Sequence, residues 1–162
     1  MYRAFKAKQF RLLPLSESHL DVLHALWTTP GVRKYLWDDK IISREKTAQI
    51  ISQSIENMRS NGYGLWLAES AGQKIVGFSG FWPFHEPPRI ELIFGIDQEF
   101  WNMGYATELG EFMIEVVARE FAIDPILASL DAANKASLAV LGKLGFRQTY
   151  HDEDKDTIFL TR

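Results

Sequence analysis

A single glutamate, Glu91, stands inside the apolar stretch IELIF. If this stretch is a β-strand, alternation places the Glu91 side chain on the same face as Ile93 and Gly95. A carboxylate in such a position either pairs with a cation, such as Arg89 or Lys74, or borders a wet cleft where it can accept a proton. The residues alone favour the ion pair and leave proton transfer as the alternative.

A lone glycine, Gly104, interrupts the stretch FWNMGYATELG between an apolar run and a helix-like pattern. A strand that ends, turns on one glycine and continues as a helix leaves backbone N–H groups pointing outward, where an anionic ligand binds favourably. The stretch lacks the glycine spacing of a P-loop or of the GxGxxG turn. By itself it predicts a tight strand–helix junction, with anion binding as the alternative.

A second helix of chemical interest is expected in NKASLAVLGKLGF. Asn134 is a good N-cap, and Gly145 suits the left-handed position after the last turn. Phe146 can then pack back on Leu141, as in a Schellman motif. Gly142 fits less well, because a glycine inside a helix costs about 1 kcal/mol relative to alanine. We therefore expect another group to approach Gly142 closely.

The elements that position these residues follow from hydrophobic periodicity and from turn signals. In chain order we expect a strand at 10–14, a helix at 17–27, a turn at 32–37, a helix at 43–60, strands at 63–70, 74–82 and 89–96, a helix from 104 to 123, a strand at 126–132, a helix from 134 to 145, and two strands in 146–162. The apolar face of the helix that follows Gly104 comprises Leu109, Phe112, Met113 and Val116. This order predicts a mixed α+β sheet and not the strict alternation of a doubly wound dinucleotide-binding fold.

Composition limits the classes of function. The chain has 162 residues, of which 18 are basic and 21 acidic, and the net charge of −3 argues against nucleic-acid binding. It has no cysteine, which excludes disulfides and thiolate chemistry, and its four histidines lack metal-ligand spacing, so we expect no metal. No apolar stretch reaches the ~18 residues of a membrane span. The first residues lack the features of a signal peptide. We expect a single cytoplasmic domain over residues 1–162, without a membrane partner.

Together, IELIFGIDQEFWNMGYATE and NKASLAVLGKLGF make the chain resemble the GNAT superfamily of N-acetyltransferases, specifically its RimJ/RimL-type branch. The resemblance covers residues 9–161 and implies an α+β fold with a mixed, mostly antiparallel central sheet flanked by helices. It also implies a splayed strand pair that holds acetyl-CoA. Relatives often dimerise through sheet edges or C-terminal strands, so we allow for a homodimer.

The resemblance assigns the glycine turn to cofactor binding. The family signature, Gln/Arg-x-x-Gly-x-Gly/Ala, falls here on Trp101, Asn102, Met103, Gly104, Tyr105 and Ala106. It implies that amides from Asn102 to Thr107 hold the pyrophosphate of acetyl-CoA, with the helix dipole assisting. The chain departs from the pattern at two positions. Trp101 replaces the usual Gln or Arg. Asn102 stands where glycine is common, so its side chain would narrow the space for the pyrophosphate.

The same resemblance assigns residues to the pantetheine arm. Backbone groups of Phe94, Gly95 and Ile96 would bond it as an added strand would, and Asn134 and Ser137 would contact the cofactor from the second helix. Gly95 is a poor strand residue and suits a place where a ligand presses on the backbone. A bulge in a buried strand is the alternative for this glycine.

For the reaction, the resemblance implies that Glu91 takes the proton of the attacking amine, directly or through water. A backbone amide of the splayed strand would stabilise the oxyanion of the tetrahedral intermediate. Some relatives use a tyrosine on the second helix to protonate the departing thiol. Leu141 holds that position here, so Ser137, Tyr105 or water would replace it.

The acceptor site is assigned to Trp82, Phe84 and His85, which lie next to the strand that carries Glu91. Sheet packing explains the two aromatic residues equally well, and an exposed loop explains the histidine. The acceptor would be a protein N-terminal α-amine or a small-molecule amine that attacks the thioester in a ternary complex. Because the signature is incomplete, a non-catalytic acyl-CoA-binding module is the alternative function.

Overall fold

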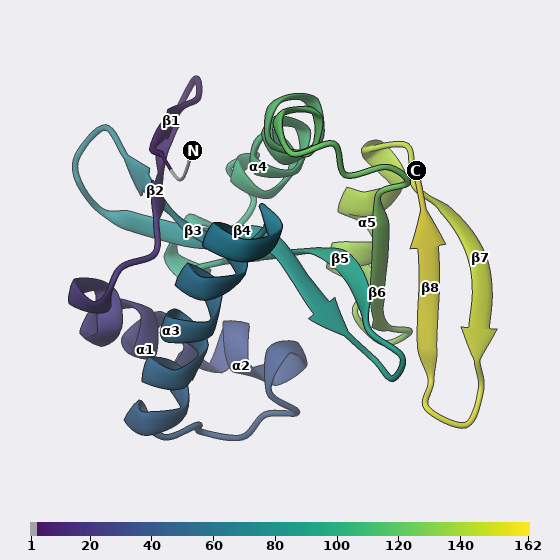
Figure 1. Cartoon of the computed structure of the whole chain (residues 1–162). Coiled ribbons are helices and arrows are strands. Elements are labelled where there is room, and N and C mark those ends of the chain that lie inside the picture. The colour runs from purple at the N-terminus through teal and green to yellow at the C-terminus, as the bar shows by residue number, and fades with distance from the viewer. Residues whose placement is uncertain (1–2) are drawn as a thin grey trace.

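The computed structural model describes residues 3–162, and its strands form one eight-stranded sheet (Figure 1). The first two residues of the expected domain lie outside the described part. The strands are β1 (Phe5–Lys6), β2 (Phe10–Pro14), β3 (Leu65–Ser70), β4 (Ile75–Phe84), β5 (Arg89–Ile96), β6 (Leu127–Asp131), β7 (Arg147–Asp152) and β8 (Thr157–Thr161). The helices are α1 (Leu20–Thr28), α2 (Pro30–Leu36), α3 (Arg44–Asn61), α4 (Tyr105–Phe112) and α5 (Lys135–Lys143), with short helical turns η1 (Glu17–His19) and η2 (Gln98–Phe100) and a π-helical segment η3 (Met113–Ala118).

The strand order is β1-β2-β3-β4-β5-β6-β8-β7. Every neighbouring pair is antiparallel except β5 and β6, which run parallel. The predicted α+β fold with a mixed, mostly antiparallel sheet is therefore confirmed. The short strand β1 is an addition that the sequence pattern did not indicate.

Helices cover both faces of the sheet, and Figure 1 shows α4 above its middle strands and α1 and α3 below them. Helices α1 to α3 pack around a buried cluster that includes Trp27 and Phe78. Helices α4 and α5 pack with η3 around a second cluster that includes Leu109 and Met113. Within residues 3–162, no helix has both the length and the apolar character needed to cross a membrane.

Alternation along β5 distributes its side chains between these two layers. Leu92 and Ile96 are buried in the cluster beneath α4, whereas Ile93 packs against the cluster of α1 to α3. Glu91 is two residues from Ile93 and therefore lies on the α1–α3 face. The predicted placement of Glu91 on the face of Ile93 is confirmed.

The predicted turn at 32–37 is wrong, because these residues belong largely to helix α2. Pro30 occupies the first turn of α2, where a proline is tolerated because the N–H that it lacks would have no helical acceptor. Thr29 between α1 and α2 has an extended backbone. The proline thus starts a new helix, and only Thr29 separates it from the preceding one.

The helix that begins at Tyr105 changes to π-helical geometry at Met113. Val117 is completely buried, whereas Val116 is only partly buried. The predicted apolar face is confirmed, because Leu109 and Met113 are fully buried and Phe112 and Val116 pack against the same cluster.

Candidate active site

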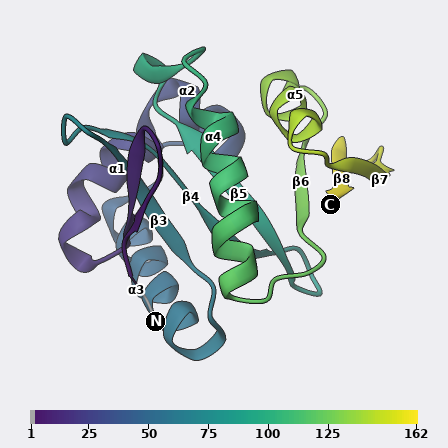
Figure 2. The ribbon, with the colours of Figure 1, turned by 90° about the horizontal axis from the view of Figure 1, so that it is seen from above.

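A gap in the sheet opens between β5 and β6. The two strands pair at one register position, Glu91 with Leu127. Figure 2 shows them separating from this end toward the side of the molecule where α4 begins. Strands β6, β8 and β7 remain paired with one another, so the sheet divides into two parts that meet near Glu91. The expected splayed strand pair is present.

The strand register shows which backbone groups face this gap. The Asp97 N–H donates to the Val76 carbonyl at 2.8 Å. Bonded positions alternate along an antiparallel ladder. The peptide groups of Gly95 are therefore directed toward Phe78 on β4, and those of Phe94 toward the gap. Among the β5 N–H groups that could stabilise an oxyanion, the register directs the Phe94 N–H into the gap.

Gly95 itself is explained by packing across this ladder. A Cβ atom added at Gly95 would lie 2.6 Å from the Phe78 ring, closer than real Cβ contacts allow. The aromatic ring on β4 therefore requires a glycine at this position, whether or not a ligand is bound.

The turn before α4 presents free backbone N–H groups. Gly104 is the N-cap of α4 with a left-handed φ of 82°, and Asn102 has a φ of 60°. The Glu108 N–H donates to the Gly104 carbonyl at 3.1 Å and begins the helical bonding. Within the described part of the chain, the N–H groups of residues 102–107 donate to no protein acceptor. Successive free donors at a helix N-terminus suit an anion such as a diphosphate.

The side chains of this turn leave it open. Met103 is 57% exposed, whereas Ala106 and Thr107 are half-buried. Tyr105 packs edge-on against an aromatic ring of η2, with the ring centroids 5.9 Å apart. A Cβ atom at Gly104 would meet nothing within 4 Å, so the backbone angle, and not space, requires the glycine.

The Trp101 side chain lies between the end of β5 and helix α2. Its indole Nε1 donates to the Ile96 carbonyl at 2.8 Å, at the end of β5. A Cβ atom at Gly31 would lie 2.7 Å from the indole ring, so the ring rests on the first turn of α2. Trp101 therefore connects the turn with the α1–α3 layer. Its hydrogen bond uses the carbonyl of Ile96, a residue predicted to bind the pantetheine arm.

Helix α5 begins and ends as its sequence predicts. The Asn134 side chain accepts a hydrogen bond from the Ser137 N–H at 3.2 Å. Gly145 has a left-handed φ of 84°, and the Phe146 N–H donates to the Leu141 carbonyl at 3.0 Å. The N-cap and the Schellman motif are both confirmed.

No protein group makes the close approach that was expected at Gly142. No atom lies within 4 Å of a Cβ placed there, and the residue is exposed. The close approach occurs instead at Gly110 of α4, where a Cβ would lie 2.3 Å from the Leu144 side chain. Ser137 is half-buried, and no other described residue hydrogen-bonds its hydroxyl. Ser137 and Gly142 are five residues apart, about 140° around the helix, so they lie on different sides of α5.

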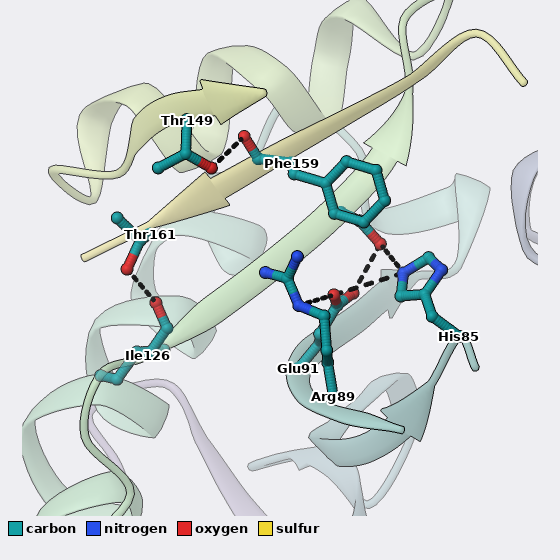
Figure 3. A network of polar contacts seen from close by, with 8 residues as sticks. His85, Arg89, Glu91, Ile126, Thr149, Phe159 and Thr161 are labelled. Atoms are coloured by element: carbon teal, nitrogen blue, oxygen red, sulfur yellow. Dashed lines mark hydrogen bonds and ion pairs between the residues drawn. The ribbon is translucent and has the colours of Figure 1, made fainter. Parts of the chain in front are cut away.

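The Glu91 carboxylate lies at the centre of a polar network (Figure 3). Its side chain is only 1% exposed. The Ser129 hydroxyl donates to Oε2 at 2.5 Å. His85 Nε2 and Arg89 Nε lie 3.3 Å and 3.4 Å from Oε1, and neither is aligned for a hydrogen bond with it. The ion pair with Arg89 is present, and two further partners accompany it.

Two members of this network, Ser129 and Phe159, were missed by sequence reasoning. The Ser129 Oγ lies 2.9 Å from His85 Nε2. The Phe159 ring lies 4.9 Å from the His85 ring. The Arg89 guanidinium lies 4.9 Å above the Phe159 ring. Ser129 is 38 residues from Glu91 in the chain. The only available signal was alternation in β6, which cannot reveal which strand lies beside it.

The other residues assigned to the acceptor site lie on the same face of the sheet. Trp82 is the register partner of Glu91, and Phe84 is the partner of Arg89. Trp82 packs against the cluster of α1 to α3, and the Phe84 ring lies 6.2 Å from the His85 ring. The structure therefore brings all three assigned acceptor residues close to Glu91.

A group of carboxylates lies at the end of β6. Asp131 is two residues beyond Ser129 and shares its face of the strand. Burial raises the pKa of Asp131, and the charges of Asp38 and Asp156 raise it further. These acidic groups make this end of the face favourable for a cationic amine. In residues 3–162, no three or more His, Asp or Glu side chains are placed to hold a metal ion.

Comparison with known proteins agrees with this geometry. The model of the acetyltransferase (GNAT) domain matches residues 9–147. The chain is 25% identical over 133 residues to the N-acetyltransferase p20 of Bacillus licheniformis, which covers 79% of this chain and 73% of that protein. An acetyltransferase from Agrobacterium tumefaciens has a TM-score of 0.85 at 14% identity, covering 100% of this chain and 95% of the other.

A further solved structure is RimL, the ribosomal L7/L12 alpha-N-protein acetyltransferase, in complex with coenzyme A. Its TM-score is 0.84 at 18% identity, and the match covers 99% of this chain and 97% of that one. The splayed strands, the free amides before α4 and the match to the domain model lead to one conclusion. The chain belongs to the GNAT family and is an acetyl-CoA-dependent acetyltransferase.

Proposed function

We propose that the protein transfers an acetyl group from acetyl-CoA to a primary amine by direct attack in a ternary complex. The observation that carries the proposal is the run of free N–H groups at residues 102–107, next to the open end of the β5–β6 gap. These amides would hold the diphosphate of acetyl-CoA, as a helix N-terminus does for phosphate groups. The arm would then lie in the gap and bring the thioester toward Glu91.

Residues on the two sides of the gap have different tasks in this proposal. The Phe94 peptide groups, directed into the gap, would bond the pantetheine arm, and its N–H would stabilise the oxyanion. Asn134 and Ser137 would contact the arm from α5. The amine would approach from the α1–α3 face, where Trp82 and His85 lie beside Glu91.

The reaction forms one bond and breaks one. The neutral amine attacks the acetyl carbon, a proton leaves the nitrogen, and the C–S bond breaks to release the thiolate. Glu91 supplies the negative charge that favours removal of that proton. Because its side chain is 1% exposed, we infer that it acts through an intermediary and not by direct contact. The Ser137 hydroxyl or water would return a proton to the thiolate.

The acceptor is a protein N-terminal α-amine or a small-molecule amine. The fold shared with RimL, described as an alpha-N-protein acetyltransferase, favours the first class. An α-amine, with a pKa of about 8, is also neutral far more often at pH 7 than a lysine side chain with a pKa of about 10.4. The acidic groups near Asp131 would attract either kind of acceptor.

The test compares the wild type with Glu91→Gln on a panel of peptides, polyamines and aminoglycosides, following thiol release. We expect normal acetyl-CoA binding and turnover lowered about a hundredfold or more, since a neutral amide keeps the shape and removes the charge. Unchanged turnover would remove Glu91 from the mechanism. A wild type that binds acetyl-CoA but acetylates no amine of the panel would identify an acyl-CoA-binding module instead.

A further inference from the structure

We propose that His85 is the group that takes the proton from the acceptor amine, and that Ser129 and Glu91 hold it in the working orientation. The inference rests on the proposed amine acetylation and adds the intermediary which that proposal lacks. It assigns His85 a catalytic role and Ser129 a positioning role.

The hydrogen bonds of the network determine which ring nitrogen carries a proton. An ionised carboxylate can only accept, so the Ser129 hydroxyl must donate to Glu91 Oε2. Their separation of 2.5 Å is typical of a hydroxyl bonded to a charged carboxylate. The Ser129 oxygen can then only accept from His85, whose Nε2 lies 2.9 Å away. The proton of the neutral imidazole therefore sits on Nε2, and Nδ1 keeps a free lone pair.

Exposure separates the parts of the network that can touch a substrate from those that cannot. The Glu91 side chain is 1% exposed, whereas the His85 side chain is 31% exposed. Within residues 3–162, His85 Nδ1 has no hydrogen-bond partner. Figure 3 shows Nδ1 on the side of the ring that faces away from Glu91 and Arg89. The one basic nitrogen of the network that a substrate can reach is therefore Nδ1.

Two charged groups lie beside the imidazole and act in opposite directions on a positive ring. Glu91 Oε1 lies 3.3 Å from Nε2, and a positive ring there would meet a buried negative charge. Arg89 of β5 opposes this effect, because its Nε lies 3.4 Å from the same oxygen. Strands β6 and β8 contribute the neutral Ser129 and the Phe159 ring. Glu91 and Arg89 are the charged groups packed against the ring in the described network.

The proton transfer can be written in full. As the amine nitrogen bonds to the acetyl carbon, its N–H proton moves to Nδ1 of His85, and the C–S bond breaks to release the thiolate. The imidazolium then returns its proton to water, which restores the resting tautomer. Ser129 and Glu91 exchange no proton in this sequence and keep the ring oriented.

The experiment replaces His85 with glutamine, whose amide nitrogen can take the place of Nε2 and donate to Ser129 but cannot accept a proton. We expect turnover to fall about a hundredfold, with unchanged acetyl-CoA affinity by calorimetry. Protonation of a general base produces an acid limb in the wild-type activity profile. That limb should disappear in the variant. His151→Gln is the matched control, because His151 also lies beside a carboxylate, 3.1 Å from Asp156, and should behave as wild type.

Two further variants separate catalysis from structure. In His85→Ala, free imidazole should restore part of the turnover. Ser129→Ala should lower turnover without weakening acetyl-CoA binding, and Ser129→Thr, which keeps the hydroxyl, should recover most of it. The inference is wrong if His85→Gln keeps its turnover and its acid limb, or if it loses activity only by failing to bind acetyl-CoA. A wild type that acetylates no amine would overturn the proposed function as well, so the two failures are distinguishable.

Discussion

Replacing Gly142 with alanine tests whether the cofactor lies along α5. The residue is inside the helix, and a Cβ atom there would meet no protein atom within 4 Å. The methyl group therefore causes no clash in the free protein. Because glycine is a poor helix former, the free energy of unfolding should rise by about 0.5–1 kcal/mol. For a chain of this size, 1 kcal/mol corresponds to a rise in melting temperature of about 2–4 °C.

The same methyl group should weaken binding of acetyl-CoA. If the cofactor lies against the side of α5 that carries Gly142, the added carbon meets the ligand, and overpacking typically costs about 1–3 kcal/mol. This corresponds to an increase in the dissociation constant of about 5- to 150-fold. The expected result is thus a protein that is more stable alone but binds its cofactor less tightly.

Urea unfolding of the free protein and titration calorimetry with acetyl-CoA measure the two effects separately. Gly110→Ala is the matched control, because its Cβ would lie 2.3 Å from the Leu144 side chain and should destabilise the protein by about 1–3 kcal/mol. If Gly142→Ala destabilises the free protein, the space above this glycine is not open. If its cofactor affinity equals that of the wild type, the cofactor does not approach Gly142.

Two further predictions concern the turn and the acidic group. Gly104→Ala introduces no clash but forces alanine into a left-handed φ of 82°, so urea unfolding should show a loss of about 1–2 kcal/mol, and calorimetry a weaker binding of acetyl-CoA. Unchanged affinity would exclude this turn as the diphosphate site. The folded protein raises the pKa of Asp131 above its usual 3.8. It therefore binds the proton more tightly than the unfolded chain, and stability should fall as pH rises from 3.8 through the folded pKa. Asp131→Asn should reduce this fall in urea unfolding between pH 4 and pH 7, and an unaltered pH dependence would contradict the assignment.

Local features of the active site could be predicted from the sequence because they depend on neighbours in the chain. The left-handed angles of Gly104 and Gly145 follow from glycine at helix boundaries, and the Asn134 cap from its side chain at a helix start. The placement of Glu91 on the face of Ile93 follows from strand alternation alone. The family resemblance added the splayed strand pair and the role of the turn, which no local rule contains.

Contacts between distant segments required the tertiary structure. The glycines illustrate the difference, because the sequence indicates that Gly142 is unusual but not that Leu144 packs on Gly110. The change to π-helical geometry at η3 was likewise not indicated by residue spacing.

The positions of the turns, the face of β5 that carries Glu91 and the amides left free before α4 could be read from the residues alone, since these features depend on backbone geometry over a few residues. The groups around the Glu91 carboxylate depend instead on how the folded strands pair. The parallel pairing of β5 with β6 brings Ser129 to Glu91 across 38 residues, and the same pairing places His85 within 2.9 Å of that serine. Strand periodicity tells which face a side chain takes but not which strand lies beside it, so the network around Glu91 became visible only in the folded sheet.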